Sequence, residues 1–342
     1  MQEPLAINSK ARRGISLRSW LFLFSCNLMW ALQFTCIKLV QDQVGPLFTV
    51  WGPMTLATVM LYPLIRHERA HGERSRDRRL SDIWVYLLLA VLGVFPGQVI
   101  ITWGTRMSLA SNAALLTLTL PVSTAFLAFI FLGERMTRIR WISFALAIAG
   151  VLLCSDIDFH SLNFGSGFLF GNLLIFVGTL GSAFYNSYGK KVLERYSPME
   201  MLFYTYVAMF VIMTPLTLAQ EWKVFAAIPH FTGRTWTGMA LLTFFHNYLS
   251  MVLFLKALKH LEAIQAALSN YLISFFGIPI AAIWLGERLK LIAIVGGIMV
   301  LGSTLLITLW DEKARAADEP ALEPATAADA QAHRASPPLR NE

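Results

Sequence analysis

The sequence predicts an all-α polytopic membrane protein with ten transmembrane helices, arranged as two inverted five-helix repeats. Three observations carry this prediction: an apolar composition, ten apolar runs, and a long stretch that occurs twice. Hydrophobic residues make up 56% of the 342 residues and the mean hydropathy is +0.56. Charged residues make up only 14%, whereas a soluble protein typically has about 25%. The apolar runs are about twenty residues long, which is enough to cross the hydrocarbon core of a bilayer.

The doubled stretch lies at residues 110–135 and 263–288, which read ASNAALLTLTLPVSTAFLAFIFLGER and AIQAALSNYLISFFGIPIAAIWLGER. At an offset of 153 residues, 10 of the 26 positions are identical, including the final Leu-Gly-Glu-Arg. Earlier in the halves, Lys38 corresponds to Lys190 at an offset of 152. A repeat of this length predicts two homologous halves.

The chain begins with a polar, basic segment, residues 1–19, before a first span at 20–40. This run is longer than a signal-peptide core and lacks a clear small-x-small cleavage site, so we interpret it as a membrane helix. Further spans are predicted at about 46–65, 84–105, 110–132, 141–155, 166–188, 200–219, 235–257, 264–285 and 291–310. The predicted organisation is therefore a cytoplasmic segment (1–19), a first repeat (20–155), a second repeat (156–310) and a disordered cytoplasmic tail (311–342) rich in Ala, Glu and Pro.

The distribution of basic residues predicts the orientation. With the N-terminus inside, the cytoplasmic segments hold 22 of the 28 Lys and Arg residues and the outer segments hold 6. The positive-inside rule favours this arrangement, with both termini on the cytoplasmic side of the inner membrane. Because each half has an odd number of spans, the second half enters the membrane upside down. Inverted repeats of this kind are typical of secondary transporters.

Two halves that each end in the pattern A-x-x-A-A-L…A-x-x-x-L-G-E-R resemble the EamA family of the drug/metabolite transporter superfamily. The phrase LKALKHLEAIQAAL at 255–268 is similar to the same family, and the resemblance covers roughly residues 20–310. It implies export or exchange of a small metabolite or drug-like solute by alternating access, without ATP hydrolysis. The second half departs from the pattern, because Ser274 stands where the first half has Pro121, and Pro279 is displaced.

Polar side chains inside the apolar runs are the candidate substrate-binding residues. Such groups cost free energy in lipid unless they find partners or face a water-filled path. Two pairs recur in both halves, Asn112 with Gln265 and Thr117 with Asn270. The other candidates are Trp30, Gln33, Gln98, Tyr185, Asn186, His246, Asn247 and Tyr271. We expect the two pairs to flank a central cavity from opposite sides, although amides that merely cross-link helices explain them equally well.

Ion coupling has weak support in the sequence. No Asp or Glu lies deep in a predicted span, and proton- or sodium-coupled carriers usually need one. His246 near the middle of span eight titrates near neutral pH when unperturbed, but a neutral His satisfied by a neighbour is the simpler interpretation. Trp30, near the centre of span one, forms either a cavity wall or ordinary packing. Facilitated transport or exchange therefore fits the sequence better than coupled transport.

Both copies of the repeat end in Gly-Glu-Arg, and we interpret these residues as structural rather than functional. We expect Glu134 and Glu287 to form ion pairs with the arginines that follow them, while the preceding glycines allow the turn.

One motif points to another class of protein. His67-Glu68-Arg69-Ala70-His71 matches H-E-x-x-H, the zinc-protease pattern. It lies in a short Arg-rich loop, and no third ligand follows at a recognisable spacing, so we interpret it as a chance match. An intramembrane zinc protease nevertheless stays as one alternative, and a membrane scaffold or sensor that moves no solute is another.

The remaining expectations follow from what the sequence lacks. There is no nucleotide-binding P-loop, and the three Cys residues have no metal or disulfide spacing. We therefore expect no enzyme activity, no catalytic or metal-binding residue and no cofactor. The expected partners are a small-molecule substrate and the lipid bilayer, without nucleic acid, because the net charge of +7 sits in loops as an orientation signal. The oligomeric state is left open.

Overall fold

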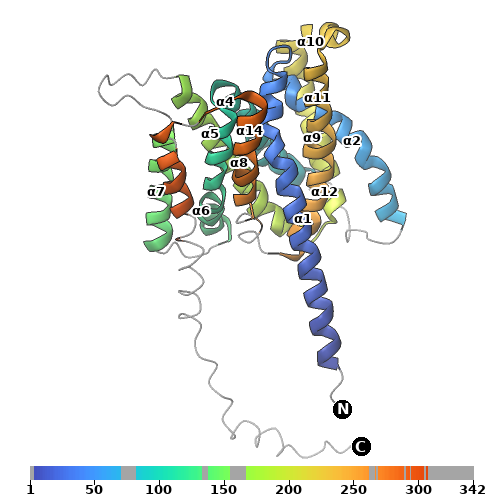
Figure 1. Cartoon of the computed structure of the whole chain (residues 1–342). Coiled ribbons are helices and arrows are strands. Elements are labelled where there is room, and N and C mark those ends of the chain that lie inside the picture. Colours follow the sequence, from blue (N-terminus) through green and yellow to red (C-terminus); the bar gives the residue numbers. More distant parts are fainter. Residues whose placement is uncertain are drawn as a thin grey trace, which may run out of the picture.

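The computed structural model describes residues 4–70, 82–132, 138–154, 167–261, 266, 269–288, 290–292, 294–303 and 306. All the secondary structure in these residues is helical, which confirms the all-α prediction. Most helices run between the same two ends of one bundle (Figure 1).

The first half contains α1 (Pro4–Val40), α2 (Pro46–Ala70), α3 (Asp82–Leu88), the π-helices η1 (Leu89–Val94) and η2 (Pro96–Ile100), α4 (Ile101–Met107), α5 (Ala110–Leu116), the 3-10 turn η3 (Thr117–Thr119), α6 (Leu120–Leu132) and α7 (Arg138–Cys154). The second half contains α8 (Gly167–Val192), α9 (Pro198–Glu221), α10 (Lys223–Ala227), the 3-10 turn η4 (Ile228–His230), α11 (Gly233–Leu241), the π-helix η5 (Leu242–Leu249), α12 (Ser250–His260) and α14 (Tyr271–Leu285).

The prediction of ten spans is confirmed in part. Within the described residues, six helical segments are long and apolar enough to cross a membrane: Arg18–Val40, Pro46–Glu68, Ile83–Met107, Phe168–Val192, Pro198–Glu221 and Gly233–His260. Two shorter apolar helices lie at Leu272–Leu285 and Ile294–Ser303. The predicted fourth span is interrupted by the turn η3, and α7 is 17 residues long.

Equivalent contacts at opposite ends of the bundle show the inverted repeat directly. The Lys38 ammonium donates to the carbonyl of Arg106 (3.1 Å), at the end of α4. Its repeat equivalent, Lys190, donates to the carbonyls of Leu258 (2.7 Å) and Lys259 (3.1 Å), at the end of α12. Lys38 lies near the C-terminal end of α1, whereas Lys259 shares a cavity with Arg18 near the other end of the membrane-spanning part of α1. Twenty helical residues separate these positions, or about 30 Å.

Carboxylates from one half cap helices of the other half. Glu221 accepts hydrogen bonds from the amides of Leu47 (3.0 Å) and Phe48 (2.8 Å), in the first turn of α2. Glu68, which is equivalent to Glu221 at an offset of 153, accepts from the hydroxyl of Ser197 (2.8 Å), the N-cap residue of α9. Negative charge at a helix N-terminus is stabilising, so each half completes a helix end in the other.

The Glu287 contact corrects the expectation for the repeated Gly-Glu-Arg. Gly286 adopts a left-handed conformation with φ of 68°, as a turn at a helix end requires. Glu287, however, accepts from the amides of Ala110 (3.0 Å) and Ser111 (2.9 Å) and from the Ser111 hydroxyl (2.8 Å). The carboxylate thus caps α5, where the unpaired amides of a helix start attract an anion more strongly than an exposed arginine does. Glu134 lies outside the described residues.

The third span (α3 to α4) and α8 meet along a row of glycines, which forms a close contact between the halves. A Cβ on Gly104 would lie 2.5 Å from the carbonyl oxygen of Gly171, and one on Gly178 would lie 2.7 Å from that of Pro96. One on Gly181 would lie 3.0 Å from the oxygen of Gly93. Small residues let helix backbones approach in lipid, where packing replaces the hydrophobic effect.

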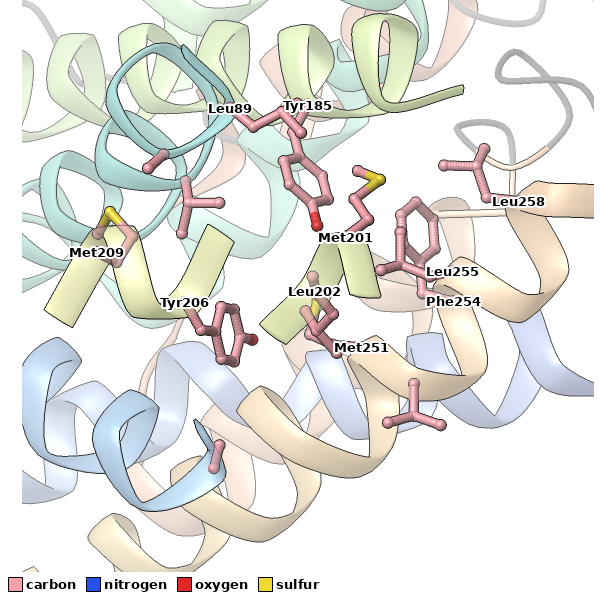
Figure 2. Packing of buried hydrophobic residues seen from close by; sticks show 14 of the residues in the cluster. Leu89, Tyr185, Met201, Leu202, Tyr206, Met209, Met251, Phe254, Leu255 and Leu258 are labelled. Atoms are coloured by element: carbon pink, nitrogen blue, oxygen red, sulfur yellow. The ribbon is translucent and has the colours of Figure 1, made fainter. Parts of the chain in front are cut away.

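The largest apolar cluster lies around α9 and joins both halves. Figure 2 shows the side chains of Met201 and Leu202 between Tyr185 on one side and Phe254 and Leu255 on the other. Met199, Met209, Met213 and Met251 belong to the same cluster. Because methionine is unbranched and flexible, such a core adapts to small movements of its helices.

Candidate solute-binding site

Six helical spans converge on a cavity of about 80 Å³ inside the bundle. Its lining comprises Trp30, Gln33 and Phe34 of α1; Gly97, Gln98 and Ile101 of η2 and α4; Thr117 and Leu120 of η3 and α6; Ser182 and Asn186 of α8; His246 of η5; and Asn270 with Ile273 at the start of α14. These are spans one, three, four, six, eight and nine, which form three repeat-equivalent pairs. The cavity therefore lies where the two halves face each other.

The equivalence extends to single residues. Thr117 and Asn270 are equivalent at an offset of 153, as are Leu120 and Ile273, and all four line the cavity. Trp30 and Ser182 are equivalent at the offset of 152 that holds earlier in the halves, and so are Phe34 and Asn186. The inverted repeat thus supplies opposing walls, with different side chains on each.

His246 and Gln98 form the polar contact across the cavity. His246 Nε2 lies 3.1 Å from Gln98 Oε1, and because a carbonyl oxygen only accepts, the imidazole donates here. Both residues lie on π-helices, η5 and η2. Residues 89–94 of η1 correspond to 242–247 of η5 at an offset of 153. A π-turn adds a residue to the helical turn and often marks a functional site.

Several buried polar atoms at the cavity have no hydrogen-bond partner within the described part of the chain. They are the indole nitrogen of Trp30, His246 Nδ1, and both amide atoms of Asn270. The residue Asn270 is 1% exposed and His246 is 4% exposed. A buried polar group without a partner costs about 1–3 kcal/mol, so four such atoms around one cavity create a demand for hydrogen bonds that water or a polar ligand would satisfy.

The structure gathers seven of the twelve predicted site residues at this cavity: Trp30, Gln33, Gln98, Thr117, Asn186, His246 and Asn270. Phe34, Ile101, Leu120, Ser182 and Ile273 also line it and were not predicted. The repeat offset would have identified Ser182 from Trp30 and Phe34 from Asn186. Apolar lining residues carry no polar signal, which is why the sequence analysis missed the others.

Three predicted residues lie elsewhere. Asn112 is buried in α5, near the end capped by Glu287, and does not line the cavity. Tyr185 packs in the apolar cluster around α9. The Asn247 side chain donates to the carbonyl of Leu242 (2.9 Å), and the Asn247 carbonyl accepts from the hydroxyl of Tyr206 (2.8 Å).

Two predicted residues fall outside the described part of the site. Gln265 lies outside the described residues, and so does the side chain of Tyr271, although α14 begins at this residue. The expectation that Asn112 and Gln265 flank the cavity therefore fails for Asn112, and the expectation for Thr117 and Asn270 agrees with the cavity lining.

Within the zinc-protease motif, Glu68 serves helix packing and His67 is exposed. Glu68 accepts a hydrogen bond from Ser197, and His71 lies outside the described residues. In the part of the chain that the structure describes, there is no group of three or more His, Cys, Asp or Glu side chains that could hold a metal ion.

Comparison with known proteins identifies the chain's relatives. The model of the EamA-like transporter family matches residues 17–155 and 169–309. A probable terminal-alkyne amino-acid exporter of Streptantibioticus cattleyicolor is 27% identical over 81% of this chain and 89% of its own length. An S-adenosylmethionine uptake transporter of Rickettsia bellii is 24% identical over 75% of this chain and 82% of its own. One solved crystal structure matches this chain with a TM-score of 0.60 and 13% sequence identity. The match covers 86% of this chain and 98% of the chain in that structure, and it supports the fold alone.

Proposed function

The chain belongs to the EamA-like transporter family, and we propose that it carries a small polar solute through the 80 Å³ cavity by alternating access. Members of this family are transporters and not enzymes. The observation that carries the proposal is the set of unpartnered polar atoms on Trp30, His246 and Asn270. A solute with its own hydrogen-bonding groups satisfies them, and an empty cavity leaves their desolvation uncompensated unless water enters.

The proposed solute is neutral or zwitterionic. No Asp, Glu, Lys or Arg lines the cavity within the described residues. The indole N–H of Trp30 and the Asn270 amide donate, while His246 Nδ1 and the Asn270 carbonyl oxygen accept, because His246 Nε2 already carries the proton toward Gln98. Donors and acceptors on one small site suit an amino-acid-like solute with a carboxylate and an ammonium. The relative named as an amino-acid exporter is consistent with this class.

The cavity must widen to accept such a solute. Its volume of about 80 Å³ has room for several water molecules, whereas ligand pockets usually measure about 300–1,000 Å³. Movement of α1 away from α4 in the first half, or of α8 away from α12 in the second half, supplies the extra volume, and the Met-rich cluster around α9 permits small helix movements. The contacts of Lys38 and Lys190 at opposite ends act as the two closures. Breaking one while the other holds would open the cavity to a single side.

We further propose that both termini lie in the cytoplasm of a cell with the protein in its inner membrane. The support is the distribution of Lys and Arg, with 22 residues on the proposed inner side and 6 outside. In this orientation the Lys190 closure is cytoplasmic and the Lys38 closure is external. The solute moves outward or is exchanged.

The other two candidate functions have less support. A zinc protease would need His67 and Glu68 to face a metal, whereas Glu68 accepts a hydrogen bond from the capping hydroxyl of α9. A scaffold or sensor without transport does not explain why polar atoms gather without partners around a cavity. It also predicts no solute flux.

Transport by the purified protein in proteoliposomes tests the proposal. Counterflow of radiolabelled neutral amino acids, purines, organic cations and phosphorylated sugars would identify the solute. We expect Asn270→Ala to raise KM for the solute about tenfold, since it removes one or two hydrogen bonds of about 1 kcal/mol each. The matched control is Asn112→Ala, which removes an amide from outside the cavity and should leave KM within about twofold.

Two outcomes would contradict the proposal. Flux of no solute in any class would favour a scaffold or sensor. Equal effects of Asn270→Ala and Asn112→Ala on KM would show that the solute does not bind in this cavity. Thermal unfolding of both variants separates loss of binding from loss of folding.

A further inference from the structure

A second cavity, of about 260 Å³, lies at the end of the bundle where α1 enters it. Arg18, Ser19 and Phe22 of α1 line one side, and Lys256, Lys259 and His260 of α12 line the other. Glu68 of α2 and Pro198 of α9 complete the wall. This cavity shares no lining residue with the solute cavity, so the two are separate sites.

The charge of this basic cavity is strongly positive. Arg18, Lys256 and Lys259 supply three permanent cations against the single carboxylate of Glu68. The Glu68 carboxylate already accepts a hydrogen bond from the hydroxyl of Ser197 at the start of α9. The dipole of α9 offsets part of the negative charge of Glu68 there. Like charges gathered from helices of both halves repel one another, so the cavity is more stable with an anion inside.

Two of the three cations have defined surroundings, whereas Lys259 is exposed. The guanidinium carbon of Arg18 lies 5.2 Å from the ring centroid of Phe22, a cation–π distance. Lys256 is half-buried, so its ammonium reaches the cavity over its own apolar stem. Directly behind, the Lys190 ammonium binds the carbonyl of Lys259 (3.1 Å) and adds to the positive potential. Arginine and lysine together are the usual ligands of phosphate.

At the same level, the face of α1 that points away from the cavity is apolar and exposed. Trp20, Leu21 and Phe24 are exposed by 42%, 58% and 45%, whereas Ser19 beside them is buried. A tryptophan next to basic residues at the end of a membrane span marks the headgroup level of a bilayer. The cavity thus lies at the headgroup level, where a phospholipid would present its phosphate.

We propose that the basic cavity binds the phosphate group of an anionic phospholipid and that this lipid bridges α1 of the first half and α12 of the second. Basic pockets between membrane helices are known to hold anionic headgroups. The inference concerns binding alone and does not rest on the proposed transport function.

Native mass spectrometry of the purified full-length protein tests this proposal by counting retained lipids. We expect phosphatidylglycerol to bind more tightly than phosphatidylcholine. The double variant Lys256→Gln/Lys259→Gln should weaken phosphatidylglycerol binding about 25-fold, since each cation near a headgroup contributes about fivefold. The matched control is Lys223→Gln/Arg234→Gln, which removes two exposed cations of α10 and α11 and should leave this binding unchanged.

Inorganic phosphate provides the second arm, with thermal unfolding as the readout. Protection by phosphatidylglycerol but not by phosphate, lost in the Lys256/Lys259 variant, supports the lipid. Equal protection by inorganic phosphate would assign the site to a soluble phosphate compound and overturn the lipid source. Equal binding of both lipids, or no difference between the two double variants, would overturn the site itself.

Discussion

At the scale of single residues, the cavity is asymmetric where the repeat is symmetric. The Thr117 hydroxyl donates a hydrogen bond to the carbonyl of Ala114 (2.6 Å). Its equivalent in the second half is Asn270, and both side-chain amide atoms of Asn270 lack a partner within the described residues. At this pair of positions the first half therefore supplies a satisfied hydroxyl and the second half supplies unpartnered hydrogen-bonding atoms. A solute bound in this site would be oriented by Asn270 and His246 of the second half together with Trp30 of the first.

His246 illustrates how a cavity residue can be tested for structure and for chemistry together. His246→Gln keeps an amide opposite Gln98, whereas His246→Leu leaves Gln98 Oε1 without its donor. We expect the Leu variant to lose about 1–3 kcal/mol of unfolding free energy and the Gln variant to lose less than about 1 kcal/mol, since buried unpaired acceptors are costly. Thermal unfolding in detergent measures both.

The same variants test proton coupling. If His246 is a neutral partner of Gln98, transport by His246→Gln should keep the wild-type pH profile between about pH 5 and 8, the range in which histidine ordinarily titrates. A pH dependence present in the wild type and absent from the Gln variant would show that His246 carries a proton during transport.

Helix geometry explains why Thr117 lines the cavity and Asn112 does not. Asn112 and Thr117 are five residues apart, which is a rotation of about 140° on an α-helix, so they do not share a face. Thr117 and Asn270 face the cavity, and Asn112 does not. The sequence reveals which residues are polar, but the face that each presents depends on crossing angles that only packing sets.

At the scale of helices, the glycine row between the third span and α8 fixes how closely the halves approach. Gly93 and Gly97 are four residues apart, a small-residue spacing suited to helix packing, and the structure places them against Tyr185 and Ser182 of α8. Pro96 between them removes a backbone donor, in agreement with the π-helices around it. The equivalent π-helix η5 contains neither Pro nor Gly, so no residue signal could have predicted it.

A methyl group on this row is expected to separate the halves. In Gly104→Ala the Cβ would lie 2.5 Å from the Gly171 oxygen, a backbone atom that cannot rotate away. We expect a loss of about 1–3 kcal/mol, the usual cost of overpacking, together with reduced transport.

Gly302→Ala is the matched control for this variant. It adds the same methyl group where nothing lies within 4 Å and should be neutral or slightly stabilising. Equal thermal stability of the two variants would mean that the third span and α8 can move apart freely.

At the scale of the whole molecule, the fold was predictable because repeat and charge pattern agree. The all-α architecture and its two halves followed from the doubled Leu-Gly-Glu-Arg stretch and the loop charges, and they agree with the family model over 17–155 and 169–309. The contacts that join the halves were not predictable, because Glu221 and Glu287 lie about 175 residues from the amides that they cap. Long-range partners of this kind depend on the packed structure.

The two lysine closures should act in opposite directions. Lys38→Met removes the bond to Arg106, and Lys190→Met removes the bonds to Leu258 and Lys259 at the other end. We expect Lys38→Met to populate the state open at its own end, and Lys190→Met to populate the state open at the opposite end. A cysteine introduced at Ser182 in a background without Cys26, Cys36 and Cys154, labelled with an impermeant maleimide from either side, reports which state dominates.

Opposite shifts in side-specific labelling would support alternating access between two equivalent closures. Shifts in the same direction, or none, would show that the two ends do not open in alternation.

The exchange of helix caps has a consequence for how such a chain can arise and be divided. Glu68 completes a helix of the second half, while Glu221 and Glu287 complete helices of the first, so neither half has all its helix ends satisfied alone. Two antiparallel copies of a single half-length ancestor could have satisfied each other in the same way before their genes fused. The fused protein should still tolerate a break between α7 and α8, provided that both fragments are made together and meet in the same membrane.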